Sequence, residues 1–400
     1  MLIGLVGKPS VGKSTFFKAS TMADVAIAPH PFTTIKPNHG IAYVKVDCID
    51  TEFKVQCNPN HGFCIEGKRF VPVELMDVAG LVRGASEGKG LGNKFLDDLR
   101  EADAFIQIVD ISGRTDAEGK LLPEGETHNP LGDVEFLEDE LNKWYHNILL
   151  KAWRSFSKKA ETESNEDFSK LVAKQFSGLK IKEEDVKNVL REFEFKKSPS
   201  LWSKEELMMF SSKLREKSKP MIIAANKIDI PGAAENYEKM KKKFPNTLII
   251  PCSADSELAL REASKTSLID YIPGEKKFEI ADKKRITDRQ KEALNRIKKE
   301  VLDKFPHGTG VQEVLNRVVF GLLEYIAIFP AGANKLGDSK GRILPDCFLL
   351  PKGSTALDFA YFLHTDFGKN FIKAIDARTK KALGKNYELK NRDALEIVTK

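Results

Sequence analysis

The chain has 400 residues, of which 41% are hydrophobic and 30% are charged, and this balance excludes the disordered and fibrous classes of protein. No apolar run approaches the ~18 residues that a membrane span needs, and the N-terminus starts with an apolar strand rather than a secretion signal. Five scattered cysteines do not form the framework of a secreted disulfide-rich domain. We therefore expect a cytoplasmic protein with no membrane partner, while the net charge of +6 leaves an anionic partner open.

The first 112 residues alternate short apolar strands with turns and helical segments, which is the pattern of an α/β sheet. The expected strands are Leu2–Val6, Ile41–Val46, Val71–Met76 and Ala104–Val109, and the segment Phe95–Glu101 is of helical type.

The pattern then becomes helical, because apolar residues recur at helical spacing from Val134 to Ala152. Ser203 and Glu206 have the form of a capping box that opens a further helix. The other expected elements are helices at Phe168–Phe176 and Asp185–Phe195 and strands at Met221–Ala225 and Leu248–Pro251. This order predicts a helical insertion within an α/β domain.

Two more capping boxes, Thr287 with Gln290 and Thr309 with Gln312, predict helices after a basic linker. The tail reads as a small α+β module with strands at Ile326–Phe329, Cys347–Leu350, Ile372–Asp376 and Ala394–Val398 and a helix at Ala356–His364. The chain is thus predicted to divide into an α/β domain (1–127 and 207–275), the helical insertion (128–206), a helical linker segment (276–324) and the tail module (325–400).

The tail is basic, with 13 Lys and Arg residues against 8 Asp and Glu residues in positions 325–400. Lysine and arginine neutralise phosphates, so this surface is a candidate for RNA contact or is simply a solvated face. The residues considered are Lys369, Lys373, Arg378, Lys380 and Lys381.

Cys57, His61 and Cys64 cluster in a turn rich in Gly and Asn. A metal site there would need a fourth ligand, such as Cys48, and the spacing matches no standard zinc pattern. Ordinary turn residues are the preferred interpretation, with a metal site or a redox-active pair as alternatives.

The residues Gly7, Lys8, Pro9, Ser10, Val11, Gly12, Lys13 and Ser14 match the phosphate-binding loop G-x-x-x-x-G-K-[ST] in full. A strand precedes the loop and a helix pattern follows it from Thr15, which is expected to bind nucleotide together with the residues of the loop. Glycines let backbone N–H groups wrap around phosphate at a helix N-terminus. Lys13 can reach the β- and γ-phosphates, and the Ser14 hydroxyl can coordinate Mg²⁺.

Asp77-Val78-Ala79-Gly80 follows the strand Val71–Met76. Asp77 can hold Mg²⁺ through water, and the Gly80 amide can contact the γ-phosphate. In Pro31-Phe32-Thr33-Thr34, Thr34 is the preferred further Mg²⁺ ligand, with Thr33 next. The glycine-rich stretch Gly80–Gly92 can rearrange when the γ-phosphate leaves.

Asn226-Lys227-Ile228-Asp229 closes the strand Met221–Ala225. The Asp229 carboxylate can accept two hydrogen bonds from the edge of guanine, a donor pair that adenine lacks. Asn226 would hold neighbouring loops, Lys227 would cover the base, and Ser253 with Ala254 offers a backbone amide to guanine O6.

With these motifs in order, the chain resembles the TRAFAC GTPases, and within them the Obg family and its YchF-type subfamily in the archaeal form. The segments Asp77–Ala85 (DVAGLVRGA) and Gly90–Leu96 (GLGNKFL) carry this resemblance, and Leu350–Thr355 (LPKGST) with Ala360–Asp366 (AYFLHTD) resembles a TGS domain. The implied fold is α/β: a P-loop G domain with a mainly parallel sheet, a helical insertion and a C-terminal ubiquitin-like β-grasp (TGS) domain. The resemblance also implies a link to the ribosome or RNA through the TGS and helical surfaces.

Two positions depart from related GTPases. Leu81 stands where many place a water-orienting Gln, which implies slow hydrolysis completed by another group; His30 and Lys89 are candidates. Ser10 replaces an Asn that is associated with potassium activation, so potassium stimulation is left open. Many YchF-type proteins also lack the N-K-x-D motif and favour ATP, whereas Asp229 favours GTP here.

The leading interpretation is therefore a monomeric, Mg²⁺-dependent GTPase that cycles between GTP and GDP as a slow conformational switch. Its expected catalytic residues are Lys13, Thr34 and Gly80, with Ser14, Thr34 and Asp77 as metal ligands. The alternatives are an ATPase of the same family and an RNA- or ribosome-binding module whose nucleotide site is largely structural.

Overall fold

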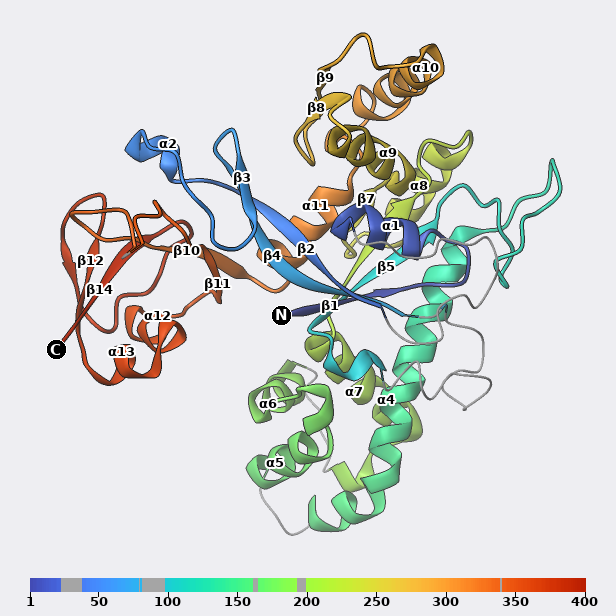
Figure 1. Ribbon diagram of the computed structural model, residues 1–400. Helices are drawn as coiled ribbons and strands as arrows, with labels where there is room; N and C mark the ends of the chain where they lie inside the picture. The colour runs from blue at the N-terminus through green and yellow to red at the C-terminus, as the bar shows by residue number, and fades with distance from the viewer. Residues whose placement is uncertain (23–37, 79, 81–97, 161–164, 193–198, 339) are drawn as a thin grey trace. The chain divides into compact units, whose positions relative to one another are not determined.

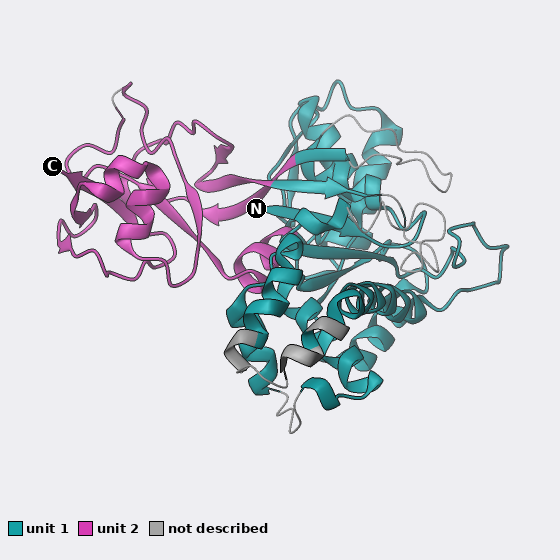
Figure 2. Cartoon of the chain, turned by 90° about the horizontal axis from the view of Figure 1, so that it is seen from below, with its two compact units in different colours: residues 1–40, 74–314 teal, residues 41–73, 315–400 magenta. Residues whose placement is uncertain are grey.

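The computed structural model describes residues 1–22, 38–78, 80, 98–160, 165–192, 199–338 and 340–400. The chain forms two compact units (Figure 2). The first comprises residues 1–40 and 74–314, and the second comprises residues 41–73 and 315–400. Among the described residues, no helix combines the length and the apolar character needed to cross a membrane.

The first unit is built on a mainly parallel sheet (Figure 1). Parallel pairing joins neighbouring strands in the order β4, β1, β5, β6, β7. These strands are β1 (Leu2–Val6), β4 (Lys68–Asp77), β5 (Ala104–Asp110), β6 (Met221–Asn226) and β7 (Ile249–Pro251). Loops at the carboxyl ends of such strands meet at one edge, where ligands bind in open α/β sheets.

Helices cover both faces of this sheet (Figure 1). On one face, α1 (Lys13–Thr21) packs against α9 (Ala254–Lys265). On the other, α4 (Pro130–Ala160) packs against α7 (Lys204–Ser218) in a core that includes Phe105 of β5. The helix expected around Val134–Ala152 is confirmed, and its side chains Val134, Leu137 and Leu141 are buried. The other helices of this region are α5 (Asn165–Gln175) and α6 (Glu183–Glu192), with 3₁₀ turns at Leu99–Glu101, Ser177–Leu179 and Pro199–Leu201.

Several further elements come after β6 in the chain, and some are not expected from the sequence. The hairpin of β8 (Ile269–Tyr271) and β9 (Phe278–Ile280) is not expected from the sequence: β9 lies in the stretch after Pro273 that is predicted to be a basic linker, and β8 lies just before that stretch. The helices are α8 (Ala233–Lys243), α10 (Asp288–Ile297) and α11 (Val311–Asn316), with π-helical turns at Lys298–Leu302 and Arg317–Leu322.

Two of the three expected capping boxes are confirmed. Ser203 caps α7 with Glu206, and Thr287 caps α10 with Gln290. The box expected at Thr309 is wrong, because the carbonyl of Gly310 accepts the first helical hydrogen bond, from the Val314 N–H at 2.9 Å. The Thr309 hydroxyl instead donates to the buried Glu257 carboxylate at 2.5 Å.

The second unit contains the tail module as a five-stranded sheet in the order β11, β10, β14, β12, β13. Helix α12 (Ala356–Leu363) packs on this sheet through Phe359, which shares a core with Ile328 and Leu395. The elements are β10 (Tyr325–Pro330), β11 (Phe348–Pro351), β12 (Phe371–Asp376), β13 (Ala382–Leu383), β14 (Ala394–Thr399) and the short helix α13 (Thr365–Lys369). A helix packed on a small mixed sheet is the arrangement expected for a β-grasp module.

Residues 41–73 of the second unit form a strand, a turn and a hairpin. Strand β2 (Asn38–Asp47) leads into the one-turn helix α2 (Asp50–Phe53), and β3 (Phe63–Ile65) then pairs antiparallel with β4. The boundary between the units cuts β2 after Gly40 and β4 before Glu74.

Candidate nucleotide-binding site

The phosphate-binding loop joins β1 to α1. Gly12 occupies the N-cap position of α1 with a left-handed φ of 97°, and a Cβ atom added there would lie 2.4 Å from the Asn226 amide nitrogen. Only glycine meets both constraints. Ser10 also has a positive φ, of 61°, which an L-residue with a Cβ rarely adopts. The backbone therefore curls around the N-terminus of α1, where its dipole attracts anions.

The side chain of Lys13 lies inside this loop. Its ammonium group donates to the carbonyls of Gly7 at 3.1 Å and Lys8 at 2.9 Å. Burial lowers the pKa of Lys13 to about 8, although the nearby Asp77 carboxylate acts in the opposite direction. A partly desolvated amine of this kind gains strongly from the approach of a polyphosphate.

Ser14 and Asp77 bring two oxygen ligands together at the mouth of the loop. The Ser14 hydroxyl donates to one Asp77 carboxylate oxygen at 2.8 Å. Asp77 is fully buried, and among the described residues its other carboxylate oxygen has no hydrogen-bond partner. Burial raises the pKa of Asp77. A buried carboxylate with an orphaned oxygen beside a hydroxyl fits the hard, oxygen-binding Mg²⁺ ion.

Gly80 lies directly against the phosphate-binding loop. A Cβ atom at this position would approach the ring and backbone nitrogen of Pro9 to 2.8 Å, so only glycine allows the contact. Its backbone is thus close to the loop, as a contact to the terminal phosphate requires. Thr33, Thr34, His30, Leu81 and Lys89 lie outside the described residues, and their roles stay predictions.

Asn226 links two loops at the carboxyl edge of the sheet. Its amide nitrogen donates to the Val11 carbonyl at 2.9 Å, and its amide oxygen accepts from the Ala254 N–H at 3.0 Å. Ser253 is buried at the start of α9. One side chain therefore fixes the phosphate-binding loop relative to the loop that is predicted to face the base.

Lys227 and Asp229 complete this edge. The Lys227 ammonium donates to the Ser10 carbonyl at 2.9 Å and pairs with Asp110 at 2.8 Å. Asp229 is half-buried, and among the described residues its carboxylate has no hydrogen-bond partner. An acceptor pair left open at this place is suited to a ligand with two adjacent donors.

Asp110 is a site residue that the sequence reading missed. It ends β5 opposite Asn226 of β6 and accepts hydrogen bonds from the hydroxyls of Ser112 at 2.5 Å and Thr115 at 3.0 Å, besides its pair with Lys227. Its position at a strand end was the available signal. Lys8 also has an unexpected partner, because its ammonium pairs with Asp133 at 2.8 Å, so only its backbone faces the loop interior.

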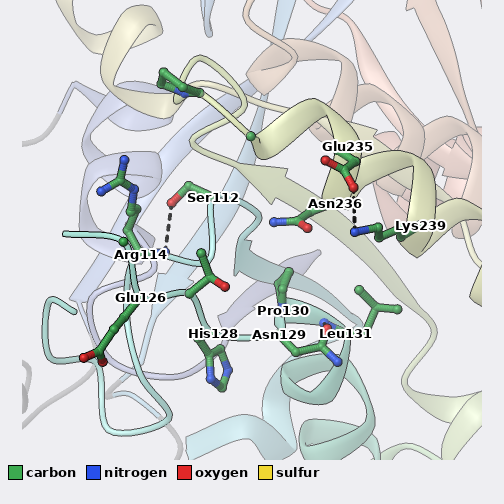
Figure 3. Close-up of a pocket in the computed structure, with 14 residues that line it drawn as sticks. Ser112, Arg114, Glu126, His128, Asn129, Pro130, Leu131, Glu235, Asn236 and Lys239 are labelled. Carbon is green, nitrogen blue, oxygen red and sulfur yellow. Dashed lines mark hydrogen bonds and ion pairs between the residues drawn. The ribbon is translucent and has the colours of Figure 1, made fainter. Parts of the chain in front are cut away.

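A separate pocket of about 660 Å³ is lined in part by Ser112, whose hydroxyl donates to Asp110 (Figure 3). Its walls come from Ser112, Arg114 and residues 125–131 and from the start of α8, where Glu235 pairs with Lys239 at 2.7 Å. None of the predicted nucleotide-binding residues lines it. The phosphate-binding loop, rather than this pocket, therefore defines the candidate site.

Comparisons with known proteins show which families the chain resembles. Residues 2–143 match the family described as 50S ribosome-binding GTPase, residues 224–332 match the G4 motif-containing domain of Obg-like GTPases of the YGR210-like type, and residues 330–399 match the TGS domain. The chain is 48% identical over 399 residues to an uncharacterized GTP-binding protein of Methanocaldococcus jannaschii, covering 100% of this chain and 99% of the relative.

Two further relatives are informative. The crystal structure of a GTP binding protein from Pyrococcus horikoshii OT3 has 38% sequence identity and a TM-score of 0.77, with 100% of each chain covered. The ribosome-binding ATPase YchF of Mycoplasma genitalium is 31% identical over 266 residues, covering 64% of this chain and 66% of the relative.

The fold and the site together define a P-loop G domain, with a helical region, in a chain that ends in a TGS domain. The chain belongs to the Obg-like, YchF-type family of GTP-binding proteins.

Proposed function

We propose that the protein is a Mg²⁺-dependent GTPase that works as a slow conformational switch on the ribosome or on RNA. The observation that carries the choice of GTP is the open carboxylate of Asp229, next to a loop that Asn226 ties to the phosphate site. Two adjacent donors on guanine match this carboxylate, whereas adenine would leave it desolvated and unpaired.

Hydrolysis in such a site depends on positioning and on charge. Lys13 and the amides of the loop hold the phosphates, and the Gly80 backbone lies against Pro9 where the terminal phosphate would be. Ser14 and Asp77 would hold Mg²⁺, which neutralises developing charge on the phosphates. Leu81 brings no polar group to orient water, so we expect a slow basal rate that a partner raises.

The link to the ribosome rests on the family named for 50S binding and on the relative named a ribosome-binding ATPase. That second name also supports an ATPase as the alternative function. The tail offers less basic surface than its composition indicates, because Arg378 pairs with Glu52 and Lys380 donates to the Ala333 carbonyl. Lys369, Lys373 and Lys381 stay candidates for RNA contact.

Competition and single-turnover experiments test this function. GTP should displace a fluorescent guanine nucleotide from the protein far better than ATP does. Ribosomes should accelerate single-turnover hydrolysis of GTP. Equal competition by ATP would favour the ATPase. Turnover that ribosomes do not change, together with tight ribosome binding, would favour a module with a structural nucleotide site.

The pKa of Lys13 predicts a pH dependence of nucleotide affinity. In the free protein Lys13 is charged below a pKa of about 8 and neutral above it. Phosphate binding favours the charged form and raises this pKa, so binding above pH 8 takes up a proton. Affinity should therefore be nearly constant below pH 8 and fall by up to about tenfold for each pH unit above it.

This dependence is measured as the dissociation constant of GDP over a pH series, with proton uptake read by calorimetry in two buffers. Lys13→Arg is the matched control, because a guanidinium stays charged over this range. The affinity of this variant for GDP should not change with pH, even if it is weaker than that of the wild type. A wild-type profile that is equally flat, with no proton uptake, would contradict the prediction.

A further inference from the structure

Four potential metal ligands converge in the segment between β2 and β4, and none of them belongs to the nucleotide motifs. Cys48 follows β2, Asp50 opens α2, Cys57 lies in the next loop and Cys64 is the central residue of β3. One ligand atom from each lies within 4.8 Å of all the others. Cys48, Asp50 and Cys57 are buried, and Cys64 is partly buried.

The distances fit a single tetrahedral ion. The sulfur atoms of Cys48 and Cys57 are 3.8 Å apart, and the Cys64 sulfur lies 3.7 Å from a carboxylate oxygen of Asp50. Four ligands about 2.3 Å from a zinc ion are separated by about 3.8 Å along the edges of the tetrahedron. The three cysteines are free thiols, and a cluster of several iron atoms would not fit between atoms this close.

Asp50 supplies an independent indication of a cation. Its side chain is only 3% exposed, and one of its carboxylate oxygens has no hydrogen-bond partner among the described residues. The other oxygen has only two long contacts, to the Cys57 N–H at 3.4 Å and to the Cys64 thiol. A buried carboxylate so poorly satisfied costs free energy unless a cation binds it.

The surrounding charge suits an anionic site. Three thiolates and one carboxylate around a divalent ion leave a net charge of −2, and a buried positive group stabilises such a site. Arg69 of β4 is fully buried and stands directly opposite Cys64 of β3 in the hairpin. Its guanidinium is held in place by the carbonyls of Leu344 at 3.0 Å and Pro345 at 2.8 Å.

We propose that Cys48, Asp50, Cys57 and Cys64 bind one zinc ion in a closed structural site. Soft thiolates select zinc over Mg²⁺ or Ca²⁺, and four protein ligands leave no open position for catalysis. Each thiol would release its proton to solvent as it coordinates the ion. Of the ligands considered from the sequence, His61 is excluded, because it is exposed and its ring contacts Asn60.

The ion would fix a loop that holds part of the tail module within the same unit. The backbone N–H groups of Asn58 and Asn60 donate to the carbonyls of Ile343 and Pro345, both at 2.8 Å. Arg69 donates to the same segment, at Leu344 and Pro345. Zinc binding would therefore order the segment that precedes β11 as well as the metal loop itself.

Metal analysis of the full-length protein tests this proposal. Protein purified without chelator or affinity metal should contain about one zinc ion per chain. Cys57→Ser and Cys64→Ser should lose it, whereas Cys347→Ser, a buried cysteine of the same unit outside the cluster, should keep it. Asp50→Asn is nearly isosteric and should weaken zinc affinity by about tenfold or more in competition with a chromophoric chelator.

Cobalt substitution keeps the test valid if a serine variant fails to fold. Co²⁺ added to the demetallated wild-type chain should give thiolate-to-cobalt charge-transfer bands and the strong visible absorption of a tetrahedral site. Absence of both zinc and these bands would overturn the proposal, as would zinc that all three ligand variants retain. A Cys48–Cys57 disulfide in metal-free protein purified without reductant would overturn it in favour of a redox pair.

Discussion

Replacing Lys13 with alanine is expected to slow nucleotide hydrolysis by about 10²–10³-fold, the effect of removing a preorganised charge from a transition state. The Lys13 ammonium is buried inside the phosphate-binding loop and makes two hydrogen bonds to its carbonyls. Alanine removes the only cation so placed among the described residues of the loop interior. Because the lost amine was desolvated, the fold itself should lose little stability.

The rate is measured under single-turnover conditions, with GDP affinity and thermal unfolding as companion readouts. Lys18→Ala is the matched control, because Lys18 lies on the same helix but pairs with Glu262 rather than with the phosphate-binding loop. It should hydrolyse GTP at nearly the wild-type rate. If both variants stay within about threefold of wild type, a difference below 1 kcal/mol, Lys13 is not part of the catalytic site.

Replacing Asp229 with asparagine is expected to lower GTP affinity by about 10²–10⁴-fold and to raise affinity for xanthosine triphosphate. A carboxylate accepts two hydrogen bonds, whereas an amide accepts at its oxygen and donates from its nitrogen. Guanine presents two donors to Asp229, so the amide nitrogen of the variant would face a donor. Xanthine has a carbonyl in place of the amino group and matches the amide.

Affinities for GTP, ATP and xanthosine triphosphate are measured in parallel by competition. Asp255→Asn is the control, because Asp255 is the neighbouring acid on α9 and burial, followed by the charge of Asp229, raises its pKa. This variant should bind the three nucleotides in the same order of affinity as the wild type. Unaltered GTP affinity in the Asp229 variant would mean that this residue does not read the base.

The strands of more than three residues and helices such as α4, α5 and α7 could be predicted because their apolar periodicity is local in sequence. Helices α8 and α9 are as long as α5 or longer and were not predicted. The strands that were missed are short: β3, β8 and β9 have three residues each and β13 has two, too few to show alternation. The capping boxes of Ser203 and Thr287 are also local. The box at Thr309 failed because Glu257, far away in the chain, takes its hydroxyl.

In the candidate site, too, the residues that the sequence predicts are those defined by their neighbours in the chain. Consecutive residues define the phosphate-binding loop, so the motif identifies it directly. Asp110 was missed because its partner Lys227 comes from a distant strand end that meets it only through sheet pairing. Asp50 was missed for a related reason, since its burial among three thiols follows from the hairpin of β3 and β4 and has no signature in the neighbouring residues.

The two hydrogen bonds of the Asn226 amide mean that substitutions at Asn226 and at Asp229 have different consequences during evolution. Any substitution at Asn226 would release the phosphate-binding loop and the Ser253–Ala254 loop together. It would therefore weaken the binding of every nucleotide alike. Asp229 makes no such bond among the described residues, so a descendant could alter it without dismantling the loop. Base preference can thus drift within a lineage one residue at a time, while the capacity to hold a triphosphate is inherited intact.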